Sequence, residues 1–112
     1  MKAWQVVRAG APSEALAWSD LPRPVPGPGE VLVETSATAL NYNEVDGCRG
    51  RYLTVNPPMP YTLGMEVVGT VVETGPGTEP WLGRRVVAAA AGAFGAHAED
   101  VRCGVPMGFD AP

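Results

Sequence analysis

The chain has 112 residues, of which 46% are hydrophobic and 18% charged, and its formal net charge is −4. This length suits one domain with its own core, and the composition is typical of a globular fold and not of a disordered chain. Arg84-Arg85 is the largest Lys/Arg cluster in this acidic sequence, so we expect no nucleic-acid partner.

The apolar runs and the two cysteines indicate in which cellular compartment the protein is expected. No apolar run approaches the ~20 residues that span a bilayer, and residues 1–8 lack the apolar core of a signal peptide. We therefore expect no membrane partner and a cytoplasmic location. Cys48 and Cys103 are too few and too far apart for a disulfide framework, which predicts reduced thiols.

The first third of the chain predicts strands separated by turns. Residues 3–9 and 15–21 favour strands, and the Gly-Ala-Pro-Ser turn between them predicts a hairpin. Residues 21–29 contain four prolines and two glycines, which excludes both strand and helix and predicts a surface connection. Residues 30–40 alternate in their first half, which predicts a long strand.

The remaining two thirds contain at most one short helix. Residues 43–49 allow one or two helical turns, with Asn41 as a possible N-cap. Residues 67–74, 85–91 and 96–102 are predicted to be further strands. Six or seven short strands with hardly any helix predict a mainly β fold, in the form of a small, partly open β-barrel.

Two glycine clusters, at residues 75–80 and 92–95, each follow a predicted strand. In the first, Pro80 stands where the third glycine of a dinucleotide fingerprint belongs. The second is followed by too few residues for a helix and a returning parallel strand. Both clusters are therefore interpreted as turns, and no dinucleotide-binding unit is expected within residues 1–112.

Four motifs follow one another along the chain: PGEVLVE (residues 28–34), LNYNEVD (40–46), GME (64–66) and GRRV (83–86). In this order and spacing they resemble the N-terminal domain of medium-chain dehydrogenase/reductases, within the zinc-independent quinone oxidoreductase and enoyl reductase branch. The resemblance covers residues 1–112. It implies a GroES-like, partly open β-barrel with one or two short helices that serves as the catalytic, substrate-side domain.

The resemblance also implies a second domain. Family members continue into a Rossmann domain that binds NADPH, and that domain is absent from residues 1–112. We therefore expect the isolated domain to be inactive, and to act with a Rossmann domain on a small-molecule quinone or enone.

Comparison with zinc-dependent relatives bears on the metal. Those relatives have a cysteine at the position of Asn41 and a histidine at that of Met65, where this chain has an amide and a thioether. Glu66 alone cannot hold zinc, which needs three protein ligands at a catalytic site. Its alternative role is to hold nearby backbone or an arginine. His97, the only histidine, is expected to be a rim side chain, so we expect no zinc and no other metal.

Metal-independent reduction needs hydride from NADPH, a hydrogen-bond donor for the carbonyl oxygen, and a proton source. The resemblance makes Asn41 the first choice for holding the nicotinamide or the substrate carbonyl, with helix capping as its alternative. Tyr42 is expected to contact cofactor and substrate, Tyr52 to be catalytic, and Met65 to contact substrate. Packing is the alternative role of Tyr42, Tyr52 and Met65.

Three positions depart from the family pattern. Glu44 stands where an aspartate is usual, Cys48 where an arginine often lies, and Arg84 where an aspartate is common. Binding details around Cys48 are therefore not carried over from the family.

A second hypothesis makes the chain a stand-alone binding or scaffolding β-barrel that pairs with another chain. An exposed apolar face that includes Met65, Tyr42 and Tyr52 would invite such pairing or homo-oligomer formation. A co-chaperonin subunit that shares the barrel is disfavoured, because Asn41 and the GME motif would have no role in it.

Overall fold

The computed structural model describes residues 1–51 and 57–105, and in these ranges the chain is mainly β with two short α-helices, as predicted. The elements in chain order are β1 (Lys2–Val6), α1 (Pro12–Ala15), β2 (Leu16–Asp20), β3 (Glu30–Thr38), α2 (Tyr42–Cys48), β4 (Tyr61–Thr62), β5 (Glu66–Thr74), the 3₁₀ turn η1 (Glu79–Trp81), β6 (Arg85–Ala89), the 3₁₀ turn η2 (Ala91–Ala93) and β7 (Asp100–Gly104).

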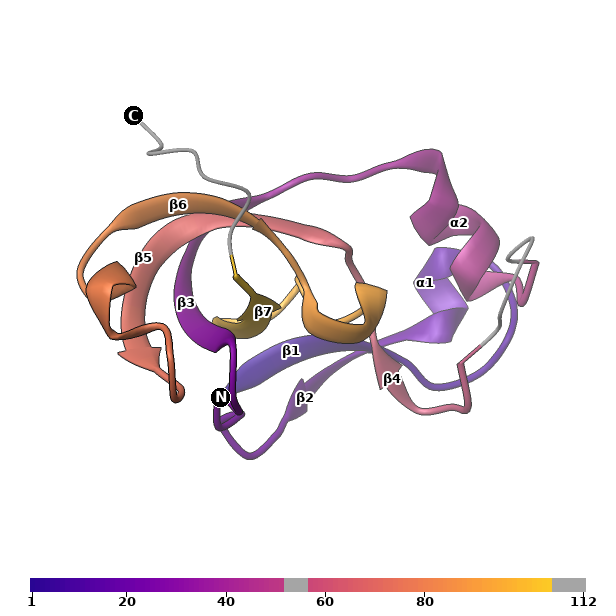
Figure 1. The fold of residues 1–112 in the computed structure, drawn as a ribbon. Coiled ribbons are helices and arrows are strands. Elements are labelled where there is room, and N and C mark those ends of the chain that lie inside the picture. The colour runs from indigo at the N-terminus through magenta and orange to yellow at the C-terminus, as the bar shows by residue number, and fades with distance from the viewer. Residues whose placement is uncertain (52–56, 106–112) are drawn as a thin grey trace.

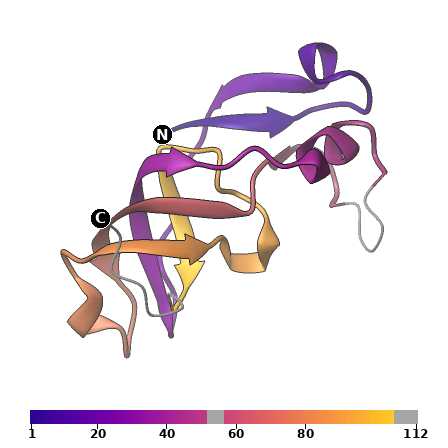
Figure 2. The same cartoon turned by 90° about the horizontal axis from the view of Figure 1, so that it is seen from above.

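The strands form two antiparallel sheets. One has the order β2-β1-β4 and the other the order β6-β5-β3-β7. Figures 1 and 2 show α1 and α2 together at one end of the molecule, with η1 at the opposite end. Within the described ranges, no helix has both the length and the apolar character that a membrane span requires.

The predicted N-terminal hairpin is confirmed, since β1 pairs antiparallel with β2 and places Trp4 opposite Trp18. The prediction of a simple turn at residues 10–13 is wrong in part, because α1 begins there at Pro12. Proline suits the first helical turn, where its missing N–H is not needed, and Ala15 at the end of the helix is buried. Residues 21–29 form no helix or strand, as their prolines predict.

The core lies on the inner face of the four-stranded sheet. Its buried members are Val31, Val33, Val67, Val71, Val86, Ala88, Ala90, Ala96, Val101 and Cys103. A smaller cluster of Val6, Ala15, Cys48 and Leu63 lies where β1 meets the two helices. Both cysteines are free and buried, and burial raises the pKa of Cys48 and raises that of Cys103 to about 12. The two thiols are not joined to each other, which agrees with the prediction of no disulfide framework.

Three local predictions are corrected. The strand predicted at residues 96–102 begins only at Asp100. The segment before it alternates in sequence, but its backbone hydrogen bonds go to residues 63–64, to β1 and to β3 instead of to one strand ladder. The two-residue strand β4 was not predicted, and η1 forms one 3₁₀ turn where no helix was expected. Elements this short bury too few side chains to leave a periodic pattern.

Candidate functional site

The site is built on the connection between β3 and α2. Asn41 is the N-cap of α2 with an extended backbone, as the sequence predicts. Its N–H donates to Glu44 Oε2 at 2.7 Å, and the Glu44 N–H donates to the Asn41 carbonyl oxygen at 3.1 Å. Glu44 thus satisfies the N-cap N–H, which is the glutamate half of a capping box. This contact orients the Asn41 backbone.

The side chain of Asn41 is held by Glu66, the first residue of β5. Asn41 Nδ2 donates to Glu66 Oε1 at 3.2 Å, and both residues are exposed. Glu66 therefore acts as the polar partner that the sequence suggested, although its partner is an amide and not backbone or an arginine. A primary amide carries two N–H groups, so a ligand carbonyl can still be bound by an amide whose orientation Glu66 sets.

The GME segment is fixed by backbone hydrogen bonds. Gly64 has φ of +101°, and its carbonyl accepts from the Ala96 N–H at 3.1 Å. The Met65 carbonyl accepts from the Ala90 N–H at 2.8 Å. The Met65 side chain is half-buried, and it stands one residue before the Glu66 that holds Asn41. The structure thus places Met65 beside the Asn41–Glu66 contact along the chain.

His97 is not the rim residue that was expected. It is only 9% exposed, its N–H donates to the Leu63 carbonyl at 2.8 Å, and its carbonyl accepts from the Trp4 N–H at 2.9 Å. These two bonds draw the residue into the junction between β1 and the GME segment. His97 Nδ1 lies 2.7 Å from Thr38 Oγ1 at the end of β3. Burial lowers the pKa of His97, against an opposing effect of the Glu44 charge.

The two tyrosines expected at the site have different outcomes. Tyr42, the first residue of α2, is 75% exposed, and Leu40 beside Asn41 is 83% exposed. The Tyr42 ring is therefore accessible to a ligand or to another chain. Tyr52 lies outside the described residues.

Two cavities lined in part by Trp4 lie near this region. One, of about 350 Å³, is lined by Trp4, Leu16, Thr38, Leu40, Leu63 and His97. The other, of about 310 Å³, shares Trp4, Thr38 and His97 and also reaches Trp18. A smaller cavity of about 180 Å³ lies at Glu66 and Thr38. Hollow surface therefore lies on both sides of Thr38.

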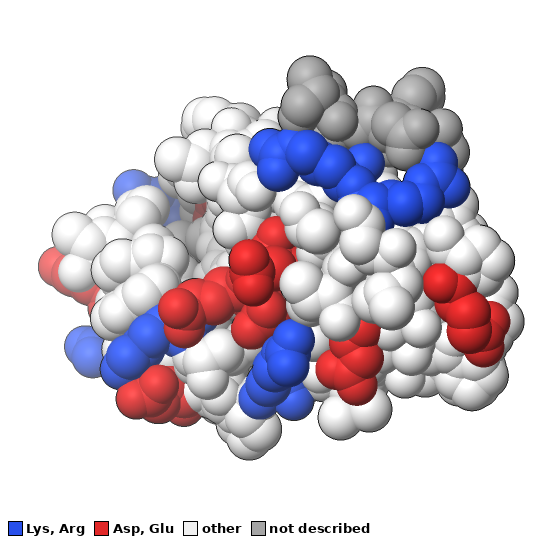
Figure 3. All heavy atoms as spheres, turned by 90° about the vertical axis from the view of Figure 1, so that its left-hand side faces the viewer, with Lys and Arg blue, Asp and Glu red and all other residues white. Residues whose placement is uncertain are grey.

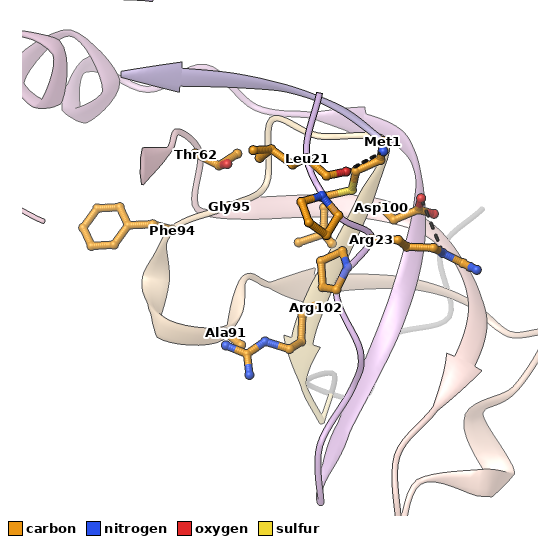
Figure 4. A pocket seen from close by; sticks show the side chains of 12 residues that line it. Met1, Leu21, Arg23, Thr62, Ala91, Phe94, Gly95, Asp100 and Arg102 are labelled. Carbon is orange, nitrogen blue, oxygen red and sulfur yellow. Dashed lines mark hydrogen bonds and ion pairs between the residues drawn. The ribbon is translucent and has the colours of Figure 1, made fainter. Parts of the chain in front are cut away.

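A pocket of about 450 Å³ lies elsewhere, between the connection that precedes β3 and the segment around η2. Figure 4 shows Phe94 at one end of this pocket and the Arg23–Asp100 ion pair at the other. The Met1 ammonium donates to the Leu21 carbonyl at 2.7 Å. Of the predicted site residues that the structure describes, Asn41, Tyr42 and Met65 do not line this pocket, so we do not place the reaction there.

The charges on the surface are mixed in sign, and the described residues near Asn41 do not form a set of metal ligands. Figure 3 shows basic and acidic side chains sharing one face of the molecule. Among the residues that the structure describes, no three His, Cys, Asp or Glu side chains are grouped to hold a metal ion. The donors brought together at Asn41 are one amide and one carboxylate, which do not make a zinc site.

Sequence reasoning gave no structural role to two residues of this arrangement, Glu44 and Thr38. Glu44 was detectable, because Asn41 and Glu44 have the N-cap and N3 spacing of a capping box. Thr38 carried no signal, since its partner His97 is 59 positions away.

Comparisons with known proteins identify a family for this chain. A sequence model described as the alcohol dehydrogenase GroES-like domain matches residues 27–108. The quinone oxidoreductase-like protein 2 of Mus musculus is 48% identical over 54 residues, which are 48% of this chain and 15% of that protein.

Two solved structures have a similar fold. The quinone oxidoreductase of Thermus thermophilus, also solved as a complex with NADPH, has a TM-score of 0.73 and 36% identity, covering 93% of this chain and 29% of that one. The Escherichia coli quinone oxidoreductase complexed with NADPH has a TM-score of 0.81 and 27% identity, covering 92% of this chain and 31% of that one. The chain thus spans less than a third of each relative's length.

Proposed function

Because the chain belongs to the alcohol dehydrogenase GroES-like domain family of the medium-chain dehydrogenase/reductases, we propose that it is the substrate-side domain of an NADPH-dependent oxidoreductase. The sequence-based predictions of this family and of a mainly β, GroES-like domain with short helices are confirmed. The two relatives described above, from Thermus thermophilus and Escherichia coli, are quinone oxidoreductases whose structures were determined with NADPH. They support reduction of a quinone as the reaction class, and the family resemblance adds an activated alkene as the other candidate substrate.

The hydrogen bond between Asn41 and Glu66 carries this proposal. It holds an exposed amide beside the GME segment, and such an amide can donate to a carbonyl oxygen as that oxygen gains negative charge. Glu44 fixes the backbone of the same residue from the other side. Two carboxylates therefore orient one neutral donor, so little reorganisation is needed when substrate binds.

NADPH would supply the hydride, and the residues present fit contact with its nicotinamide end. The Asn41 amide can pair with a carboxamide or a substrate carbonyl, and the exposed Tyr42 ring can pack on a flat ring. Met65 offers an adaptable apolar contact to the substrate. We place the groups that bind the rest of the dinucleotide in a Rossmann domain outside residues 1–112.

We further propose that the reaction proceeds without zinc. The reason is the donor set at the site, where Asn41 and Met65 provide an amide and a thioether next to the single carboxylate of Glu66. Zinc requires three protein ligands drawn from Cys, His and carboxylates at a catalytic site.

The native protein that contains this domain is expected to oxidise NADPH with a quinone or enone. Asn41→Ser keeps a residue suited to the N-cap but removes the amide, so kcat/KM should fall by about 100-fold, as for loss of one oxyanion donor. NADPH consumption, followed by its fluorescence, measures the rate.

Asn43→Ala is the matched control for this test, because Asn43 is an exposed residue of the same helix. It should leave kcat/KM unchanged, and a strong chelator should have no effect. Equal rates for Asn41→Ser and the wild type would remove Asn41 from the mechanism. Loss of activity on chelation, with recovery on adding zinc, would contradict the zinc-free reaction.

An exposed apolar surface favours a second role as a module that pairs with another domain or chain. The rings of Trp4 and Trp18 pack in a tilted arrangement with their centroids 5.0 Å apart, yet these residues are 44% and 52% exposed, and Leu40 is 83% exposed. Exposed apolar groups that line cavities often mark association surfaces.

The isolated chain is therefore expected to self-associate with increasing concentration. Size-exclusion chromatography with light scattering should show a rising average mass for the wild type and less association for Trp18→Ser. Pro24→Ser, in the connection before β3, serves as the control. A constant monomer mass at all concentrations would count against this second role.

A further inference from the structure

Two buried ionisable side chains face each other behind the candidate site. Glu44 and His97 are 3% and 9% exposed, and their Oε1 and Nε2 atoms lie 3.7 Å apart. Within the described part of the chain, neither of these two atoms has a hydrogen-bond partner. An unpartnered polar atom in the interior is costly, so the two groups have a physical reason to interact.

The second polar atom of each side chain, Glu44 Oε2 and His97 Nδ1, contacts the end of β3 or the connection from β3 to α2. Glu44 Oε2 accepts from the Asn41 N–H at 2.7 Å, and His97 Nδ1 lies 2.7 Å from Thr38 Oγ1. Thr38, Asn41, Glu44 and His97 therefore form a closed ring of contacts around the exposed residues Ala39 and Leu40. The backbone of His97 is itself fixed by bonds to Leu63 and Trp4.

The carboxylate determines which imidazole nitrogen carries the proton. An unprotonated Nε2 would direct its lone pair toward the Glu44 carboxylate in a buried setting, which is repulsive. This repulsion favours the neutral form that carries the proton on Nε2, in which Nδ1 would accept a hydrogen bond from the Thr38 hydroxyl across the 2.7 Å contact. A hydroxyl can also accept, so Thr38 can pair with Nδ1 in either protonation state.

We propose that His97 is a positioning residue whose Nε2–H holds the Glu44 carboxylate, and through it the backbone of Asn41. In this arrangement the imidazole holds Glu44 Oε1 in place, and Glu44 Oε2 in turn orients the backbone N–H of Asn41. Orientation of the Asn41 amide toward Glu66 then depends on the ring. Its consequence for catalysis rests on the role proposed for Asn41, but the contact itself can be tested separately.

Glu44 is the titratable residue of α2 that faces the imidazole. Cys48, Glu99 and Glu66 do not compete with it. Burial raises the pKa of the Cys48 thiol, also on α2, and so favours its uncharged form. Glu99, two residues after His97, accepts a hydrogen bond from the Lys2 backbone N–H. Glu66 accepts from the Asn41 amide. Among these three glutamates, Glu44 is thus the one whose carboxylate faces the imidazole ring.

Nuclear magnetic resonance of the ¹⁵N-labelled chain tests the contact. Long-range proton–nitrogen correlations at neutral pH should show the Nε2–H form of His97. His97→Phe removes the donor, so the Asn41 amide signals should shift and the exchange rate of its backbone N–H should rise by about tenfold or more. His97→Gln restores a donor near the Nε2 position and should return both properties most of the way to wild type.

A third variant covers the case in which His97→Phe fails to fold. Glu44→Asp keeps a carboxylate at the same helix position but withdraws it from the ring by one methylene, so the His97 nitrogen shifts should change while the helix persists. An Nδ1–H form in the wild type, equal effects of the Phe and Gln variants on Asn41, or unchanged His97 shifts in Glu44→Asp would overturn the proposal.

Kinetics of the native protein separate this proposal from the proposed function. A fall in kcat/KM for His97→Phe that His97→Gln reverses would support the positioning role in the reaction. Absence of NADPH oxidation in every form would instead count against the proposed function, while the resonance data would still decide the Glu44–His97 contact.

Discussion

Gly64→Ala is expected to lower the free energy of unfolding by about 3 kcal/mol or more, a large part of the total for a domain of this size. Gly64 has φ of +101°, a conformation that costs an L-residue about 1–2 kcal/mol. A Cβ there would also lie 2.7 Å from the backbone nitrogen of His97. The N–H of that nitrogen donates a hydrogen bond to the Leu63 carbonyl, so the nitrogen cannot move aside without breaking this hydrogen bond.

Gly77→Ala separates the two causes. Gly77 has a similar φ of +91°, but a Cβ added there would meet no atom within 4 Å. This variant should cost only the backbone strain, about 1–2 kcal/mol. Urea unfolding followed by tryptophan fluorescence gives both values. Equal losses for Gly64→Ala and Gly77→Ala would show that the approach of His97 to Gly64 is not a constraint.

Gly64→Ala is also expected to disturb the candidate site. Displacing His97 to relieve the clash would separate its ring from Thr38 and Glu44, and so disturb the contacts that orient Asn41. The glycine of the GME motif is thus explained by close packing against His97, in addition to its turn conformation.

Gly69→Ala is expected to be at least as damaging, with a loss of about 3 kcal/mol or more, or failure to fold. Gly69 lies in the middle of β5, between its partners Thr35 in β3 and Val86 in β6. A Cβ at this position would stand 2.0 Å from the Glu34 carbonyl oxygen. The obstacle is backbone in a paired strand, so relief requires opening the ladder beside the irregularity between Thr35 and Ala37.

Gly104→Ala is the matched control, since Gly104 is also a strand glycine but has open space around the Cβ position. It pairs with Glu30 at the sheet edge, and alanine there should change stability by about 0.5 kcal/mol or less. Thermal unfolding monitored by circular dichroism compares the two variants. A Gly69→Ala protein as stable as Gly104→Ala would contradict the tight register of β3 against β5.

Much of the fold could be predicted from local pattern. Alternation identified β3, and apolar runs between turn signals identified β5 and β6, all to within two residues at each end; the proline content of residues 21–29 excluded any element there. Asn41 was recognised as an N-cap because a cap depends only on residues within one helical turn. Such features involve near neighbours and are therefore written in consecutive residues.

The candidate site was predicted less completely. Asn41 and Glu66 were both singled out, and the structure joins them. His97 was misplaced at the rim, because a lone histidine in an alternating segment gives no sign that its backbone will bond to β1 and to Leu63. Met65 and Tyr42 keep the roles proposed for them as untested predictions.

By itself the sequence determined the family, the mainly β class, and the residue types at the metal-ligand positions, since these depend on identity and spacing along the chain. Only the tertiary structure decided that Glu44 meets the distant His97, and that Gly64 and Gly69 must lack side chains. Contacts of this kind arise from how two sheets and a helix pack together. No local propensity encodes them, because the partners become neighbours only when the loops between them close.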